Sequence, residues 1–210
     1  MNVRQSDSES EITLGLLNAV EANSQMTQRT VARDLGIALG LTNAYLKRCV
    51  RKGLIKVTQI PANRYAYYLT PKGFAEKSRL TAEYLSISFN FFRDARSECA
   101  GEFAHCLARG WTRVALAGAG DLAEIATLCA ADSGVRLIGL YDPAMTAGHF
   151  AGLRVVAQLG ELSPCDAYLV TDFRNPQATY DALVRELGPD RVLTPKLLSI
   201  SRNPPTLVED

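Results

Sequence analysis

The residue pattern with the clearest chemistry is a glycine-rich turn in the second half of this 210-residue chain. Residues 114–123 read VALAGAGDLA, an apolar run that ends in G-x-G-x-x-A at Gly118, Gly120 and Ala123. Where a buried parallel strand passes into a helix, the first glycine permits a tight turn and the second lets a pyrophosphate approach the backbone. The small third residue lets the helix pack on the strand. We therefore expect a phosphate-binding turn, with candidate contacts from Gly118, Gly120, Asp121 and Leu122.

Further polar residues are expected beside this turn, at the edge of the sheet formed by the carboxyl ends of its strands, which we call the rim. A second predicted strand ends at Asp142, 24 residues after Gly118, where an acidic side chain can bind a ribose diol. No arginine follows at once, which disfavours a 2′-phosphate. Thr171 and Asp172 follow a later strand at the same sheet edge, and Thr171 completes the candidate set. These residues predict a small nucleotide-type ligand. The alternative is that the glycines serve the fold alone and the domain binds nothing.

A second group of candidate residues lies on a predicted helix over about residues 38–52. At 100° per residue, one side carries Leu39, Thr42, Leu46, Cys49 and Val50, which we expect to face the core. The opposite side suits a DNA groove, because methyl groups contact thymine, guanidinium groups contact guanine and ammonium groups contact phosphate. The candidate DNA contacts are Leu41, Asn43, Ala44, Tyr45, Lys47, Arg48 and Arg51, with Arg64 near a hairpin tip. The alternative is a solvated basic face.

Short elements must position this helix. The expected elements are helices over 11–22, about 28–35 and about 38–52, then strands over 54–58 and 65–69 around a turn at 61–64. Thr27 is placed to cap the second helix, which is expected to stop at Gly36. Three short helices followed by a hairpin predict a winged helix-turn-helix over residues 1–72. In that design the third helix enters the major groove of double-stranded DNA.

This region resembles the MarR-type regulators associated with exopolysaccharide gene clusters. The likeness covers roughly residues 11–90 and rests on the segments Thr27-Gln28-Arg29, Asp34-Leu35-Gly36-Ile37, Leu46-Lys47, 52–57, Tyr65-Ala66-Tyr67 and 69–73. The chain departs from the family pattern at Ala38, where a serine cap is usual, and at Thr30, where a capping-box glutamate is usual. Both departures are expected to weaken helix ends. The resemblance implies DNA binding and a link to surface-polysaccharide genes.

A long helical connector is expected over residues 73–110. Thr70-Pro71 is a strong helix start, and neither proline nor glycine occurs between Gly73 and Gly101. One broad stripe on this helix carries Phe74, Lys77, Thr81, Tyr84, Leu85, Ser88, Phe91 and Phe92, with Ile87 and Phe89 beyond it. We expect the stripe to join two copies of the chain into a homodimer, which would present two recognition helices to two half-sites. The alternative is that the stripe packs on the chain's own C-terminal domain.

Alternating strands and helices predict a Rossmann-like domain over residues 111–210. The expected elements are strands over 113–117, 136–141, 153–156, 167–170 and 191–193, and helices near 121–132 and 176–187. Such alternation predicts a parallel doubly wound sheet that binds ligands at the carboxyl ends of its strands. The fold class is therefore α/β with two domains: a winged helix-turn-helix, a long helical connector and a Rossmann-like parallel sheet.

The second half also resembles the nucleotide-binding domains at the start of sugar-nucleotide-modifying enzymes and sugar acetyltransferases. The likeness lies in the 118–123 turn and in the segments 139–143 and 152–155, and it implies a nucleotide-sugar ligand. Redox-sensing repressors of the Rex type share the overall plan, which implies NAD(H) as the alternative ligand. Rex-type chains end in a swapped helix, whereas Asn203-Pro204-Pro205 argues against a terminal helix here.

Catalytic and metal-binding patterns are missing from the sequence. Tyr180 has Val184 where a short-chain dehydrogenase needs a lysine, and there is neither a G-x-S-x-G elbow nor a Walker lysine. The five cysteines form no C-x-x-C pair, and the two histidines are far apart. We therefore expect no enzyme and no metal site, and we interpret the cysteines as reduced thiols.

The charge distribution agrees with this division. Residues 1–80 hold 12 Lys/Arg and 6 Asp/Glu, whereas residues 111–210 hold 8 Lys/Arg and 12 Asp/Glu. We therefore expect polyanion binding by the N-terminal part of the chain only. No apolar run approaches the about 20 residues of a membrane span, and the polar N-terminus lacks a signal peptide, so we expect a cytoplasmic protein without a membrane partner. The sequence thus predicts a DNA-binding transcriptional regulator that responds to a nucleotide or nucleotide-sugar. The alternatives are an NAD(H)-sensing redox regulator and a regulator whose Rossmann-like domain serves only oligomerisation.

Overall fold

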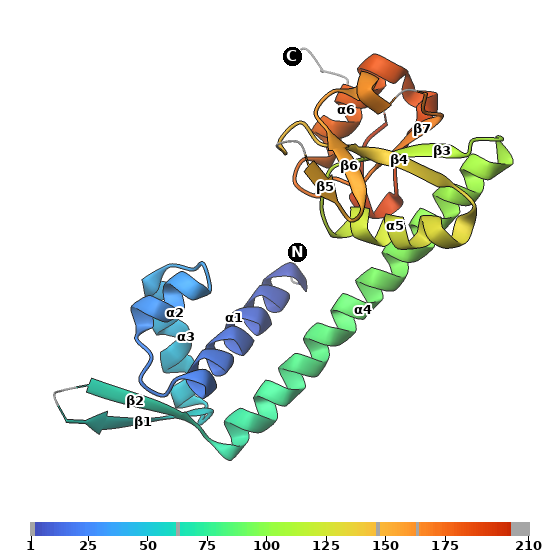
Figure 1. Cartoon of the computed structure of the whole chain (residues 1–210). Helices are drawn as coiled ribbons and strands as arrows, with labels where there is room; N and C mark the ends of the chain where they lie inside the picture. The colour runs from blue at the N-terminus through green and yellow to red at the C-terminus, as the bar shows by residue number, and fades with distance from the viewer. Residues whose placement is uncertain (1–2, 62–63, 146–147, 163, 203–210) are drawn as a thin grey trace, which may run out of the picture. The chain divides into compact units, whose positions relative to one another are not determined.

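The computed structural model describes residues 3–61, 64–145, 148–162 and 164–202, with side chains described from residue 9 onward. The chain divides into two compact units, Met1–Phe89 and Asn90–Asp210, which we describe separately (Figure 1). The boundary between them falls inside one long helix.

The first unit consists of helices followed by a hairpin, as predicted for a winged helix-turn-helix. Its elements are α1 (Val3–Ala22), α2 (Gln28–Asp34), α3 (Leu39–Arg51), β1 (Ile55–Ile60) and β2 (Arg64–Leu69), followed by the first part of α4 (Pro71–Ala108). The two strands are antiparallel, and Ile55 lies opposite Leu69. One core includes Leu16 and Leu17 of α1, Val31 of α2 and Leu46 of α3. α1 starts at Val3, well before the predicted start at residue 11. The first turns of α1 are polar and carry no apolar periodicity, so the sequence pattern did not predict them.

The ends of the two short helices only partly agree with expectation. The expectation that Thr30 weakens the start of α2 is wrong. Its hydroxyl accepts a hydrogen bond from the Thr27 amide at 3.2 Å while the Thr27 hydroxyl accepts from the Thr30 amide at 3.1 Å. This is a complete capping box with a threonine in place of glutamate. Ala38 provides no side-chain cap for α3, as predicted.

α3 rests on a narrower buried face than predicted. Thr42, Leu46 and Cys49 are buried, in agreement with the sequence analysis. Leu39 and Val50, also expected in the core, are 45% and 37% exposed, so that expectation is wrong. On a helical wheel both residues lie at the edge of the Thr42–Leu46–Cys49 face, where the neighbouring elements no longer cover them.

α4 is a single helix of 38 residues that continues through Gly101. The Thr70 hydroxyl accepts a hydrogen bond from the Gly73 amide at 3.0 Å, which confirms the predicted start. A Cβ on Gly73 would lie 2.1 Å from the carbonyl oxygen of Leu54, so the first turn of α4 requires glycine here. Leu80 is buried in the first unit, and Phe103 is buried in the second.

The second unit contains a six-stranded sheet in the order β5-β6-β4-β3-β7-β8. Its strands are β3 (Arg113–Ala117), β4 (Arg136–Tyr141), β5 (Gly148–Phe150), β6 (Leu153–Val156), β7 (Ala167–Val170) and β8 (Val192–Leu193). All pairs are parallel except β5 with β6, and β5 was not predicted. The order of the parallel strands is that of a doubly wound sheet, in which β3 and β7 flank the point where the winding reverses.

Helices cover both faces of this sheet. α5 (Asp121–Ser133) and α6 (Pro176–Leu187) lie on opposite sides of it (Figure 1). The last third of α4 packs beside α5, since the Cys129 thiol donates to the carbonyl oxygen of Arg96 at 3.6 Å. Short 3-10 helices complete the unit: η1 (Leu159–Leu162), η2 (Pro189–Arg191) and η3 (Lys196–Leu198). Residues 203–205, where no terminal helix was expected, lie outside the described residues.

All five cysteines are free thiols and buried. Within the described part of the chain, no helix is both long and apolar enough to cross a membrane. The same residues contain no group of three or more His, Cys, Asp or Glu side chains that could hold a metal ion.

Candidate functional sites

The outward side of α3 carries the residue types predicted to contact DNA. Leu41, Ala44, Lys47 and Arg51 are all exposed, and among the described residues neither Lys47 nor Arg51 has an ion-pair partner. Their two charges are therefore available to an external anion. The side chains of Asn43 and Tyr45 are half-buried and lie toward the edges of this surface.

Arg48 is oriented differently from the other residues that were predicted to contact DNA. Its Nη1 donates to Glu9 Oε2 of α1 at 2.8 Å, and this hydrogen bond is the main reason why the pKa of Arg48 is raised. The same pair acts on the neighbouring Tyr45, whose pKa is raised first by burial and then by the Glu9 charge. Arg48 thus ties α3 to α1 in this structure.

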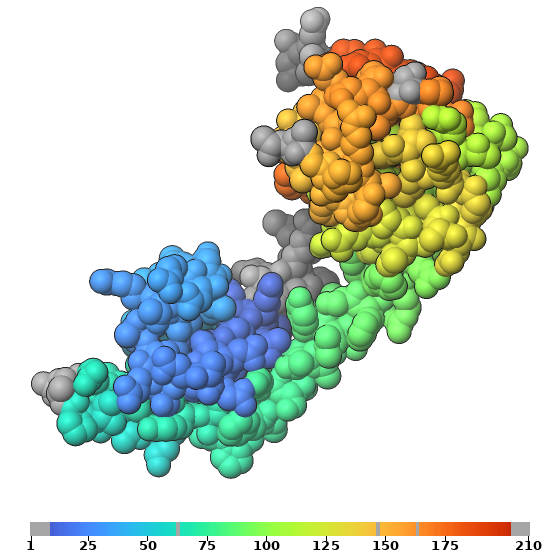
Figure 2. Space-filling view, viewed as in Figure 1, coloured from blue at the N-terminus to red at the C-terminus, as the bar shows by residue number. Residues whose placement is uncertain are grey.

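The hairpin provides a second surface of the first unit. Figure 2 shows the β1–β2 hairpin extending past the neighbouring helices. Arg64 is exposed at the start of β2, opposite Ile60, whereas residues 62 and 63 of the predicted turn lie outside the described residues.

In the second unit, the two glycines of the predicted phosphate turn have different roles. Gly118 has φ +101°, and a Cβ there would lie 2.3 Å from the Cβ of Asp172, so the close approach of the ends of β3 and β7 already requires glycine. Gly120 is the N-cap residue of α5, and a Cβ there would meet no atom within 4 Å. The space in front of α5 is therefore open. Asp121 is exposed beside it, and the Leu122 side chain is fully buried.

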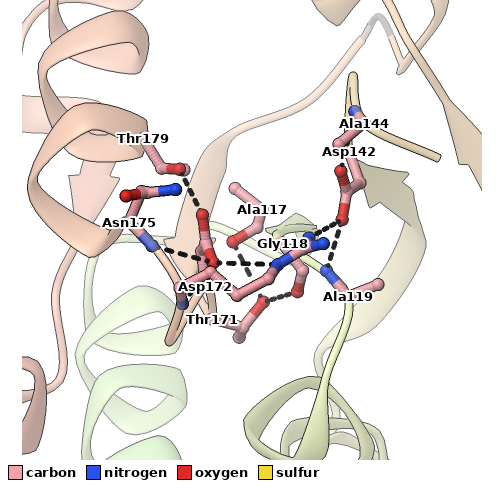
Figure 3. Close-up of polar contacts among 10 residues, drawn as sticks. Ala117, Gly118, Ala119, Asp142, Ala144, Thr171, Asp172, Asn175 and Thr179 are labelled. Atoms are coloured by element: carbon pink, nitrogen blue, oxygen red, sulfur yellow. Dashed lines mark hydrogen bonds and ion pairs between the residues drawn. The ribbon is translucent and has the colours of Figure 1, made fainter.

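Asp142 lies at this rim but is already bonded on both carboxylate oxygens. It is 2% exposed, and its Oδ2 accepts from the Ala119 amide at 3.0 Å while its Oδ1 accepts from the Ala144 amide at 3.0 Å (Figure 3). Arg174 Nη2 donates to the same Oδ2 at 2.7 Å. Asp142 therefore fixes the glycine turn, and a ribose could reach its carboxylate only by displacing Arg174.

Thr171 is fully buried, and its hydroxyl donates to the carbonyl oxygens of Ala117 and Gly118 at 3.1 and 2.6 Å. These bonds hold the end of β3 against the end of β7 (Figure 3). In this structure the hydroxyl that was expected to contact a ligand is thus used within the fold, and its role toward a ligand stays a prediction.

Asp172 was expected at this rim, at the end of β7, but its cluster of hydrogen bonds was not predicted. Burial raises the pKa of Asp172, but hydrogen bonds from the Thr179 hydroxyl and from the amides of Arg174 and Asn175 lower it below its ordinary value. The Arg174 side chain is 57% exposed and bridges this carboxylate, at 3.7 Å, to Asp142. The available signal was Asp172 directly after a strand and four residues before Pro176, where it can bond the free amides of the turn.

These residues line a cavity of about 240 Å³ at the carboxyl ends of β3, β4 and β7. Its walls include Gly118, Pro143, Asn175 and Thr179. The positively charged side chain that lines it is Arg174. The volume is below the ~300–1,000 Å³ of drug-sized ligand sites, so it matches a phosphate and its immediate neighbours and not a whole dinucleotide.

Comparisons with known proteins agree with the geometry of the first unit. Residues 9–56 match a family described as winged helix-turn-helix DNA-binding. With the observed fold, this shows that the first unit is a winged helix-turn-helix, similar to a DNA-binding family, and that it is joined to a mostly parallel α/β unit. A search of curated proteins returned no match.

Nine solved chains are similar to this protein, and three of them are similar to the following extent. The PcaV transcriptional regulator from Streptomyces coelicolor, in complex with its natural ligand, is 25% identical over 39% of this chain and 59% of its own, with a TM-score of 0.36. A second PcaV structure is 23% identical over 39% and 73%, with a TM-score of 0.31. A mutant of MepR from S. aureus is 23% identical over 40% and 61%, with a TM-score of 0.33. The chain thus spans about three fifths of the first of these proteins.

Proposed function

We propose that this protein is a transcriptional regulator whose first unit binds duplex DNA and whose second unit responds to a nucleotide-type ligand. The observation that carries the proposal is the exposed face of α3 within the segment that matches a DNA-binding family. On this face Leu41 and Ala44 are exposed, and Lys47 and Arg51 have no ion pair among the described residues. A helix of this kind enters the major groove, where methyl and guanidinium groups read bases and ammonium groups neutralise phosphates. A regulator of this kind acts in the cytoplasm.

Dimerisation would bring two such helices to one operator. The aromatic and apolar side chains on the middle of α4 favour this arrangement, because Tyr84, Leu85, Ile87, Phe89, Phe91 and Phe92 are all exposed. Large exposed apolar patches mark interaction surfaces, and two symmetric copies would cover each other's stripe. We propose a homodimer formed through this stripe.

The rim of the second unit is the proposed ligand site. Gly120 leaves open space in front of the first amides of α5, and Arg174 supplies a positive charge to a phosphate there. Capture of Arg174 by a phosphate would release its bond to Asp142, which could then accept a hydrogen bond from a ribose. The sequence resemblance to sugar-nucleotide enzymes favours a nucleotide-sugar and a polysaccharide-related gene set, with NAD(H) as the alternative.

Binding of labelled duplexes from the gene's own neighbourhood to the full chain, followed by fluorescence anisotropy, tests the DNA-binding part. We expect an affinity that falls steeply as salt rises, because Lys and Arg side chains displace counterions from phosphates. Lys47→Ala should weaken binding to all duplexes and reduce the salt slope by about one. Arg185→Ala, an exposed arginine on α6, is the matched control and should have no effect. Binding that is absent, or independent of salt, would overturn the proposal.

Titration with UDP-sugars and with NADH tests the sensor part independently. The ratio of the two Kd values separates a nucleotide-sugar regulator from a redox regulator. If neither ligand changes the Tm of the protein, the rim does not respond to these nucleotides, and the alternative of an oligomerisation role for this part of the second unit is favoured.

A further inference from the structure

A second cavity in the C-terminal unit lies apart from the rim. Its volume is about 590 Å³, and it shares no lining residue with the rim cavity. The last third of α4 forms one wall, and η2, β8 and η3 contribute to the other. The volume lies within the ~300–1,000 Å³ typical of small-molecule sites. Its charged and titratable lining residues are Glu98, Glu102, His105, Arg109, Asp190, Lys196 and Arg202.

Two of these charged side chains are fixed by the fold. Glu98 Oε2 accepts a hydrogen bond from the Leu197 amide at 2.9 Å, which ties α4 to η3. Arg202 donates from Nε and Nη2 to the Thr194 hydroxyl at 3.2 and 2.7 Å. The walls of the cavity are therefore held in place without a ligand, and pre-formed walls reduce the ordering cost of binding.

Glu102 is the unusual residue of this cavity. It is half-buried, yet among the described residues its carboxylate has neither a hydrogen bond nor an ion pair. Burial raises its pKa, while the charges of His105, Arg202 and Lys196 act in the opposite direction. A partly desolvated carboxylate without a donor is unfavourable. A ligand with N–H groups could supply the missing donor.

Gly101 opens the surface of α4 next to Glu102. Glycine inside a helix is less stable than alanine, and such a position normally has a packing reason. Here a Cβ would meet no atom within 4 Å, so no neighbouring residue requires glycine. Its effect is to leave the helix backbone open to the cavity, beside the unpaired carboxylate.

Lys196 is the positive charge of the cavity that is neither held by the fold, as Arg202 is by Thr194, nor stacked on a ring, as Arg109 is on Trp111. It is exposed, its charge acts on Glu102, and no ion pair is found for it among the described residues. A purely anionic ligand would leave Glu102 without a donor, and a purely cationic ligand would leave Lys196 without an anion. A small zwitterion satisfies both, and the apolar Val192 and Leu193 also line the cavity.

We propose that this cavity binds a free α-amino acid. The α-ammonium group donates to Glu102, the α-carboxylate accepts from Lys196, and the amino acid's side chain lies near Val192 and Leu193. The site is independent of the proposed DNA binding and of the proposed nucleotide rim, so its test requires neither DNA nor a nucleotide.

Isothermal titration calorimetry of the full chain with each common L-α-amino acid tests the proposal. We expect at least one amino acid to bind with a Kd below about 1 mM. Its N-acetyl and carboxamide derivatives, which each lack one charge, should bind at least about tenfold more weakly. Absence of binding by every amino acid, or equal binding of either derivative, would overturn the proposal.

Substitutions then locate the binding. Glu102→Gln keeps the side-chain shape and Lys196→Met keeps an apolar stem, and each should weaken binding at least about tenfold. Glu186→Gln and Arg185→Met, both exposed on α6, are the matched controls and should leave the Kd unchanged. Because Lys196 is exposed, Lys196→Met keeps the test decisive if Glu102→Gln fails to fold. Unchanged binding in the Lys196→Met protein would contradict the assignment.

Discussion

Individual charged residues at the candidate DNA surface differ in whether they already have a partner. Arg48 donates to Glu9, whereas Lys47 and Arg51 have no ion pair among the described residues. An arginine without an internal contact can turn to a guanine edge at no cost to the fold. Arg48 must first leave Glu9, or it stays in place and orients α3. The geometry therefore favours Arg51 over Arg48 as a base-reading residue.

Arg51→Ala is expected to weaken binding to a preferred duplex about ten- to a hundredfold and to relax the base preference. Arg48→Ala should weaken binding less and leave the preference unchanged, and Glu9→Ala, which removes the acceptor of the same contact, should also leave the preference unchanged. Competition among duplexes that differ at single base pairs measures both quantities. A changed base preference in Arg48→Ala, with none in Arg51→Ala, would reverse the assignment.

Asp172 predicts an acid-sensitive contribution to the stability of the second unit. Burial raises its pKa, but the bonds from Thr179, Arg174 and Asn175 lower it overall. A carboxyl group whose folded pKa lies below its unfolded value stabilises the fold above the unfolded pKa, and this stabilisation is lost as pH falls through the folded value. Urea midpoints should therefore fall below about pH 4.

The decline at low pH should be smaller in Asp172→Asn, since that side chain cannot titrate. Asp132→Asn, at an exposed position of α5, is the control and should retain the wild-type decline. An Asp172→Asn protein with the same pH dependence as the wild type would show that this carboxyl group is not responsible.

Among the elements, those with strong periodicity could be predicted and those set by tertiary contacts could not. The apolar runs of β3 and β7 and the spacing in α5 and α6 gave their positions to within a residue or two. β5 has only three residues and no alternation long enough to recognise. The pairs Arg48–Glu9 and Arg174–Asp142 join residues 39 and 32 positions apart, so no local pattern reports them. For the same reason, the ligand role expected of Thr171 could not be distinguished from a buried hydroxyl that bonds the backbone.

The exposed stripe of α4 predicts that two copies of the chain associate through this helix. Leu85 and Phe92 of the stripe are 45% and 37% exposed, and Phe89, which lies directly beside them on the helix, is 56% exposed. Phe89→Glu places a charge in a face that we expect to be buried between two copies, which would favour monomers. Sedimentation velocity should then show a shift from dimer to monomer.

A matched control for this experiment is Leu128→Glu, since Leu128 is a 61% exposed leucine on α5 outside the stripe. It should leave the sedimentation coefficient unchanged. A dimer that tolerates Phe89→Glu, or a wild-type protein that is monomeric at all concentrations, would contradict an interface on this stripe.

For the molecule as a whole, α4 is the element shared by both units. Leu80 belongs to the core of the first unit, and Cys99 and Phe103 belong to the core of the second. A ligand at the rim can change DNA affinity only by the difference in its affinity for the two states of the protein. The proposed coupling through α4 therefore requires that a rim substitution remove the ligand response without altering DNA binding in the absence of ligand.

Gly120→Val tests this requirement. The valine side chain would occupy the open space in front of α5, so the shift of Tm with UDP-sugar or NADH should disappear, while ligand-free DNA affinity stays within about twofold of wild type. Because φ at Gly120 is +158°, valine can also strain the turn, and Arg174→Gln provides a second variant that removes the rim's cation without adding a Cβ there. Ligand binding that persists in both variants would place the pocket elsewhere. A loss of DNA affinity in both variants without ligand would instead mean that the rim supports the DNA-binding state itself, and the two units could not then be treated as sensor and reader.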